Sequence, residues 1–176
     1  MAYSPTLSRP HARCRQRGAT AMEFGLIFPA LFLLIYGTLS FALMFTARMG
    51  LQHAAEEGVR SAMTFRVASQ ADPTGTTQLT LRRNAARTTA LQQASWIARW
   101  APVTVDTRVC LATSDCSIET TDCGRDLATA CKIMVTVTYP YGSNPILPTV
   151  PGLGLIGPSE LRGQASLLLE GRMLSS

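Results

Sequence analysis

The chain has 176 residues, which suits one domain or one domain with an anchor. Its composition is 47% hydrophobic and only 15% charged. Globular domains carry about 25% charged residues, so this composition indicates a membrane segment. The net charge of +5 comes mainly from positions 1–18, which hold four arginines and no acid, while basic and acidic side chains nearly balance in the rest of the chain. This distribution excludes a basic nucleic-acid-binding domain.

The basic leader is followed by an apolar segment, Phe24–Ala47, which carries no formal charge. A helix of this length rises about 36 Å and therefore exceeds the roughly 30 Å hydrocarbon core of a bilayer. Arginines stay on the cytoplasmic side of such a helix, so we expect everything from Arg48 onward to lie outside. A cleaved secretory signal is the alternative, but its apolar region needs only about 7–15 residues. The segment predicts one membrane helix, in which Gly25, Pro29 and Gly37 are tolerated.

An acid, Glu23, lies at the start of this apolar segment, and a glycine, Gly18, precedes it by five positions. A carboxylate in a membrane helix costs about 2.5–3.5 kcal/mol near the centre and less near an end. The stretch "RGATAMEFGLIFPALFLLIYG", continuing into "LQHAAEEGVRSA", resembles the processing site of type IV prepilins, and in particular the TadE-like minor pseudopilins of the tight-adherence (Flp, type IVb) pilus system. The resemblance covers the chain from its start to about Phe65. Ala19, where major pilins have phenylalanine, and the early Pro29 both suit the TadE-like branch.

The resemblance implies a processing event and an assembly contact. A membrane-embedded prepilin peptidase would cleave between Gly18 and Ala19 on the cytoplasmic face. The new α-amino group of Ala19 would then pair with Glu23 of a neighbouring subunit, so that Glu23 and the adjacent Phe24 set the register between packed subunits. A paired carboxylate is tolerated at low dielectric constant, whereas an unpaired one is costly. Without this pairing, Glu23 would lie among the cytoplasmic lipid headgroups.

The resemblance also implies a fold, a set of partners and a location. The fold is α+β and type IV pilin-like, with a long membrane helix that continues into an amphipathic stem and a second helix packed on a small antiparallel sheet of three strands. The expected partners are the prepilin peptidase, other pilins and pseudopilins, and the inner-membrane assembly platform, with no nucleic acid. The expected location is the inner membrane, with a periplasmic C-terminal domain, or the extracellular pilus.

Helical spacing of apolar residues predicts that the membrane helix continues as a stem to about Val67. These residues are Leu51, Ala54, Ala55, Gly58, Val59, Ala62 and Met63. A break rich in turn formers, 68–78, follows. A second helix is predicted from about Thr76 to Trp100, ended by Pro102. Trp96 and Trp100 share a face of this helix, and we interpret them as core packing rather than as a platform for single-stranded nucleic acid.

Three strands are predicted after the second helix, at Val103–Leu111, Lys132–Tyr139 and Gly163–Met173. The first two alternate between apolar and polar residues, which is typical of strands with one buried face. Segment 140–163 contains five prolines and five glycines. It therefore predicts a long loop rather than a regular element.

The five cysteines divide by compartment, because Cys14 lies in the leader and the other four lie close together on the predicted outer side. An oxidising periplasm favours disulfides there, and four cysteines allow three connectivities. Cys110 ends one predicted strand and Cys131 begins the next, so we prefer a Cys110–Cys131 bridge that closes loop 110–131, with Cys116–Cys123 inside it. A zinc site would need closely paired ligands, so we expect no metal.

The sequence lacks the common catalytic motifs, and both histidines lie outside the C-terminal domain. We therefore expect no enzyme activity, no catalytic residue and no cofactor. The expected organisation is a leader (1–18), a transmembrane helix (19–47), a helical stem (48–70) and a periplasmic α+β domain (71–176). We interpret the chain as a minor pseudopilin that contributes to pilus biogenesis and surface adhesion. The alternative is a permanently anchored periplasmic binding or scaffold module that is not processed; a periplasmic enzyme is disfavoured.

Overall fold

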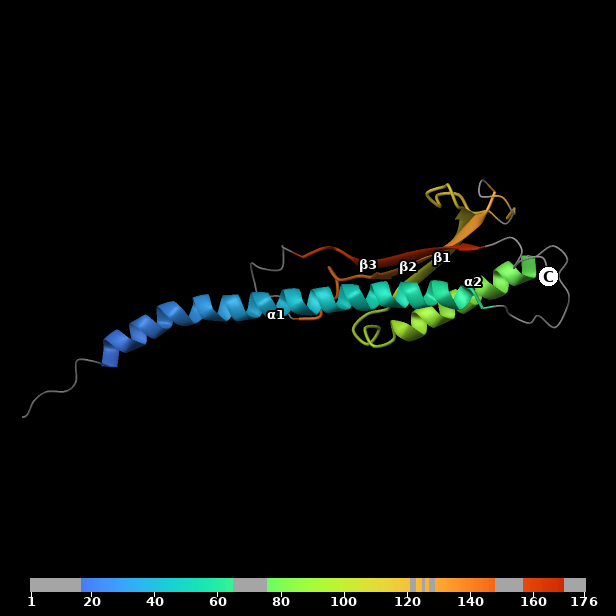
Figure 1. Ribbon diagram of the computed structural model, residues 1–176. Coiled ribbons are helices and arrows are strands. Elements are labelled where there is room, and N and C mark those ends of the chain that lie inside the picture. Colours follow the sequence, from blue (N-terminus) through green and yellow to red (C-terminus); the bar gives the residue numbers. More distant parts are fainter. Residues whose placement is uncertain are drawn as a thin grey trace, which may run out of the picture. The chain divides into compact units, whose positions relative to one another are not determined.

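The computed structural model describes residues 17–64, 76–120, 123–124, 126, 129–147 and 157–169 (Figure 1). These residues contain a long N-terminal helix, a second helix and a three-stranded antiparallel sheet, which confirms the predicted α+β class. The chain forms two compact units, one ending at Phe41 and the other beginning at Ala42. The division falls inside the first helix.

Helix α1 runs from Arg17 to Ala62 without interruption, so the predicted membrane helix and stem are one element of 46 residues. The predicted continuation of the stem to about Val67 is wrong, because the helix ends at Ala62 and a turn and a bend follow. Ser61 Oγ donates to Gly58 O at 2.7 Å, and Thr64 Oγ1 donates to Ser61 O at 2.8 Å. Hydroxyls bonded to nearby carbonyls compete with regular helix, which favours an end at this point.

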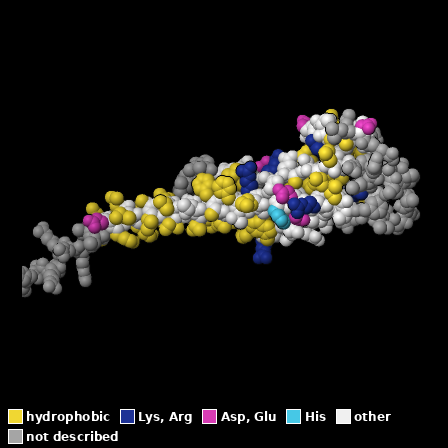
Figure 2. Space-filling model, in the orientation of Figure 1, with side chains coloured by type: hydrophobic (Ala, Val, Ile, Leu, Met, Phe, Trp, Pro, Cys, Tyr) yellow, Lys and Arg dark blue, Asp and Glu magenta, His cyan; other side chains and the backbone are white. Residues whose placement is uncertain are grey.

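The part of α1 that belongs to the first unit exposes large apolar side chains along its length (Figure 2). By length and composition α1 can cross a membrane, and its most hydrophobic window is not buried inside the structure. Its hydroxyls bond their own helix, since Thr38 Oγ1 donates to Ile35 O at 2.9 Å and Ser40 Oγ to Tyr36 O at 2.8 Å. A helix that satisfies its polar groups internally fits a single-pass membrane anchor.

The hydrophobic core of the second unit lies between α1, α2 (Thr76–Gln93) and one face of the sheet. The predicted apolar stripe of α1 is confirmed, with five residues at most 3% exposed: Leu51, Ala54, Ala55, Val59 and Ala62. Helix α2 approaches α1 closely, because a Cβ on Gly58 would lie 2.9 Å from Ala86 O and 3.0 Å from Ala90 Cβ. Small residues on both helices therefore make this packing possible.

Helix α2 is shorter than predicted and ends at Gln93 rather than at Trp100. Residues 94–100 form turns in which Ile97 N donates to Ala94 O and Trp100 N to Ile97 O, both at 3.2 Å. Hydrogen bonds between residues three positions apart wind the chain more tightly than an α-helix does. The turns bury Ile97 and leave Trp96 and Trp100 38% and 50% exposed. The prediction that both tryptophans pack in the core is therefore wrong.

The sheet has the order β1–β2–β3, with all neighbours antiparallel. Its strands are β1 (Thr104–Leu111), β2 (Cys131–Tyr139) and β3 (Leu161–Leu169), so all three predicted strands are present. The alternation of β2 is confirmed, because every second residue from Cys131 to Tyr139 is fully buried in the core. The predicted end of the third strand at Met173 lies outside the described residues.

The predicted loop 140–163 is partly regular structure, because its last three residues, Leu161–Gly163, belong to β3. The last proline of the segment is Pro158, and the residues from Leu161 onward alternate between the two faces of the sheet. One bond joins the two described ends of the loop, since Gly142 N donates to Ser159 O at 2.7 Å, and another lies within the first end, where Tyr139 Oη donates to Asn144 O at 2.8 Å. Residues 148–156 lie outside the described part of the chain.

Candidate processing and assembly site

The predicted cleavage point lies in the first turn of α1, since the helix begins at Arg17 and Gly18 and Ala19 follow. The first four backbone amides of an α-helix have no acceptor inside the helix, so this turn is held least firmly. Ala19 and Glu23 are four residues apart. They therefore share one side of the helix and are separated by about 6 Å along its axis.

Glu23 is exposed at the start of the apolar surface of α1. Within the described part of the chain, its carboxylate takes part in no ion pair and accepts no hydrogen bond. The exposed carboxylate is accessible to a positive group of another molecule.

An aromatic ladder begins at Phe24, directly after Glu23. The stacked rings of Phe24, Phe28, Phe32 and Tyr36 have centroids 5.4, 6.2 and 6.0 Å apart in succession. Their spacing of four residues places them on one side of the helix. Sequence reasoning singled out only Phe24, although the same spacing in the sequence could have revealed the whole ladder. The ladder gives the apolar helix one distinctive aromatic side.

In the second unit, a side-chain amide joins α1 to the outer edge of the sheet. Gln52 Nε2 donates to Gln164 O, and Gln164 N donates to Gln52 Oε1, both at 3.0 Å. Because β3 is an edge strand, the amide of Gln52 takes the place of a neighbouring peptide group. The preceding residue, Gly163, lies against the backbone of α1, since a Cβ there would be 2.5 Å from Gln52 N. These contacts fix the position of α1 on β3.

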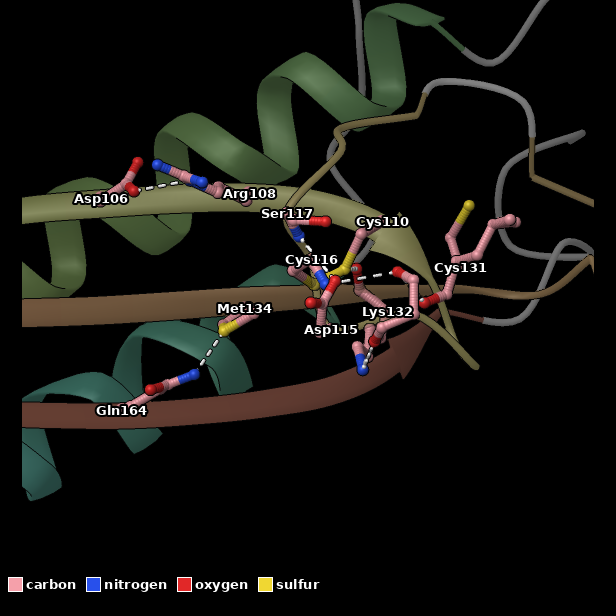
Figure 3. Close-up of a disulfide and its surroundings, with 12 residues drawn as sticks. Asp106, Arg108, Cys110, Asp115, Cys116, Ser117, Cys131, Lys132, Met134 and Gln164 are labelled. Atoms are coloured by element: carbon pink, nitrogen blue, oxygen red, sulfur yellow. Dashed lines mark hydrogen bonds and ion pairs between the residues drawn. A yellow bond between two sulfur atoms is a disulfide. The ribbon is translucent and has the colours of Figure 1, made fainter.

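The predicted disulfide pairing, Cys110–Cys131 with Cys116–Cys123, is wrong: the structure pairs Cys110 with Cys116 (Figure 3) and Cys123 with Cys131. The register of the sheet explains why. Cys110 lies opposite Lys132, and Cys131 lies opposite Leu111. Directly opposite residues share a face and successive residues alternate, so Cys110 and Cys131 point to opposite faces. Cys131 faces the core, while the loop that follows β1 covers Cys110.

The first disulfide loop is supported by short-range polar contacts. Ser117 N donates to Asp115 Oδ1 at 3.1 Å, and Lys132 Nζ donates to Ser114 O (Figure 3). The hydrogen bonds from the Ser117 side chain and backbone hold the pKa of Asp115 below its usual value. Cys116 has a φ of 62°, in the left-handed region that a residue other than glycine rarely adopts. The loop therefore has a specific conformation.

An exposed ion pair connects the same loop to α2. Arg83 and Glu119 approach to 2.9 Å and are both about half exposed, so the pair stabilises the fold by no more than about 1 kcal/mol. Within the described residues there is no group of three or more His, Cys, Asp or Glu side chains that could hold a metal ion.

Comparison with known proteins supports a structural role in a pilus system. Residues 18–60 match the model of the family described as TadE-like protein, which confirms the resemblance over this segment and includes both Gly18 and Glu23. The searches of curated proteins and of solved structures gave no match. TadE-like proteins are structural components of pilus systems rather than enzymes, so the likeness indicates a component associated with the tight-adherence pilus.

Proposed function

We propose that this chain is a minor pseudopilin of a tight-adherence pilus. It is made as a precursor, cleaved after Gly18 by a prepilin peptidase, and held in the inner membrane by residues 19–47 with its N-terminus in the cytoplasm. The chain from Arg48 onward, with its α+β domain, lies in the periplasm before assembly. The observation that carries the proposal is the order of features along α1, where Gly18, Glu23 and the apolar surface follow one another within the segment that matches TadE-like proteins.

Cleavage requires the peptide bond after Gly18 to leave the helix and enter the peptidase in an extended form. The position of this bond supports the proposal, because opening the first turn of α1 breaks few internal hydrogen bonds. A glycine on the leader side has no side chain to obstruct the approach. The arginines of the leader keep this end of the precursor on the cytoplasmic face.

Assembly then depends on a charge pair between two subunits. Cleavage converts the amide of Ala19 into a positively charged α-amino group, and Glu23 offers an exposed carboxylate one helical turn away. When two apolar helices pack in register, the amine of one subunit meets the carboxylate of its neighbour. Removing one partner leaves the other charge unpaired at low dielectric constant, which costs about 3–5 kcal/mol. A loss of this size weakens association by about 100-fold or more.

The proposal is tested by incorporation of variants into pili in a cell that carries a complete tight-adherence system. Glu23→Ala should be processed and reach the membrane in normal amounts but be lost from pili sheared off the cells. Glu23→Asp should give an intermediate level, because its shorter side chain reaches less far. Glu57→Ala is the matched control, since it removes another carboxylate of α1 whose ion pair with Arg60 is exposed. Full incorporation of processed, abundant Glu23→Ala would contradict the assembly role.

A further inference from the structure

The turn after α2 exposes two tryptophans that the proposed function does not use. Trp96 and Trp100 form an edge-to-face pair with ring centroids 6.5 Å apart, and they are 38% and 50% exposed. Arg99, which lies between them in the sequence, is also exposed. We call Trp96, Arg99 and Trp100 the tryptophan patch.

The patch is fixed to α1 immediately beyond the apolar segment. The indole of Trp96 lies against Gly50, because a Cβ at Gly50 would be 3.2 Å from Trp96 Cε2 and still closer to Cζ2. Gly50 follows Ala47, the last residue of the uncharged segment, by three positions, which is about 4.5 Å along a helix. The side chain of any other residue at position 50 would displace the indole. The contact therefore sets the height of the patch along α1.

The position of Gly50 along the axis of α1 coincides with the outer headgroup layer of a membrane that α1 crosses. The uncharged segment is about 6 Å longer than the hydrocarbon core, so its ends reach into the headgroup layers, each of which is about 5–8 Å thick. Residues 48–50 then lie within the outer layer or at its boundary with water. Tryptophan is enriched at this depth, since its ring is apolar and its N–H remains hydrogen-bonded.

We propose that the tryptophan patch docks onto the outer lipid surface of the membrane that α1 crosses, with the indoles among the headgroups and Arg99 at lipid phosphate. Charge favours lipid over a second copy of the chain, because two copies joined through this patch would bring their Arg99 side chains together. No acid occurs in segment 94–104, and Arg99 forms no ion pair with a described residue. Phosphate is therefore a suitable partner for it.

The exposed apolar surface of α1 continues up to the patch. Phe45 and Met49 are 57% and 72% exposed, and Met49 directly precedes Gly50. The docking holds the end of α2 against the membrane. It goes beyond the proposed function, because it requires only that α1 spans the membrane and is independent of cleavage after Gly18.

Fluorescence can test the docking directly, because Trp96 and Trp100 are the 2 tryptophans of the chain. The full chain is reconstituted into vesicles of phosphatidylethanolamine and phosphatidylglycerol that contain lipids with a nitroxide either near the ester carbonyls or near the end of the acyl chain. Trp96→Phe and Trp100→Phe each leave one reporter. We expect the shallow nitroxide to remove most of the emission, the deep one to remove less, and aqueous iodide to have little effect.

Two further variants sharpen the test. Leu168→Trp in a chain without the native tryptophans places a reporter on the exposed outer side of β3, and it should be quenched by iodide but by neither lipid. Phosphatidylglycerol in the vesicles should increase quenching by the shallow nitroxide, and Arg99→Gln should reduce this increase.

Vesicle flotation and resistance to alkaline extraction show separately that α1 is inserted. With α1 inserted, iodide quenching of Trp96 and Trp100 equal to that of the Leu168→Trp reporter would overturn the proposal. Protection of the tryptophans from iodide that appears only at a high protein-to-lipid ratio would show that the patch binds a second copy of the chain, and it would also overturn the proposal.

Discussion

Replacing Gly163 by alanine tests the contact between α1 and the sheet. The backbone at Gly163 does not have a left-handed φ, so alanine can adopt its conformation, and the only obstacle is the space that Cβ would occupy. That Cβ would lie 2.5 Å from Gln52 N and closer still to the carbonyl of Leu51. These are backbone atoms of a helix, so they cannot rotate away as a flexible side chain could. Helix α1 must move away from β3.

The loss of stability can be estimated from the packing and the hydrogen bonds that such a movement of α1 would disturb. Overpacking of a core costs about 1–3 kcal/mol, and the two hydrogen bonds between Gln52 and Gln164 contribute about 1 kcal/mol each. The expected loss is therefore about 3–5 kcal/mol out of a total stability of about 5–15 kcal/mol. At about 2–4 °C per kcal/mol for a domain of this size, the melting temperature should fall by roughly 6–20 °C.

The assay is thermal unfolding of the full chain in detergent, followed by near-ultraviolet circular dichroism. Ser166→Ala is the matched control, since Ser166 lies on the same strand and is exposed, and its melting temperature should stay close to that of the unaltered chain. If Gly163→Ala melts at the temperature of Ser166→Ala, then α1 does not lie on β3 in backbone contact.

Three further predictions concern the second unit. Gln52→Ala should speed hydrogen exchange at the Gln164 amide by removing its acceptor, whereas exchange at buried Val135 should be unchanged; equal protection of Gln164 in both chains would refute the edge contact. A protease that cuts after Glu119 should separate the denatured, unreduced chain into fragments, because neither disulfide spans Glu119; fragments that stay linked would contradict this pairing, since both other connectivities span Glu119. The lowered pKa of Asp115 means that its carboxylate stabilises the loop above its unfolded pKa of about 3.9 and that this contribution is lost as pH falls through the folded value. The chemical shift of the Ser117 amide should therefore change as Asp115 is protonated at acid pH, and Asp115→Asn should abolish this change. A Ser117 amide that titrates equally in both chains would contradict the hydrogen bond to Asp115.

The main elements could be predicted because each has a strong local signal. The uncharged segment Phe24–Ala47 specifies a long apolar helix, and alternation in β2 specifies which side faces the core. The elements that were misjudged depend on contacts between distant segments. Whether Trp96 is buried depends on how the turn after Gln93 is wound, and periodicity alone does not reveal this.

The disulfide pairing shows the same limit at the level of single residues. The predicted bounds of β1 and β2 agree with the observed ones to within one residue, yet the pairing depends on which face each cysteine occupies. A register in which Cys110 lies opposite Lys132 puts the two strand-end cysteines on opposite faces. A shift of one residue would reverse this, because side chains alternate with a period of two. The role of Gln52 was missed for a similar reason, since its partner Gln164 is 112 positions away along the chain.

The mass of the mature chain tests the central claim most directly. The protein is co-expressed with an active prepilin peptidase, purified from membranes and measured intact by mass spectrometry. We predict a chain that begins at Ala19 and lacks the whole leader, while Gly18→Val, whose branched side chain obstructs the cleavage point, retains Met1 and the full leader. Gly25→Ala is the matched control, because a Cβ there meets nothing within 4 Å, and it should be processed normally. An unaltered chain that keeps Met1 beside a peptidase that cleaves a known prepilin in the same cells would contradict the pseudopilin assignment.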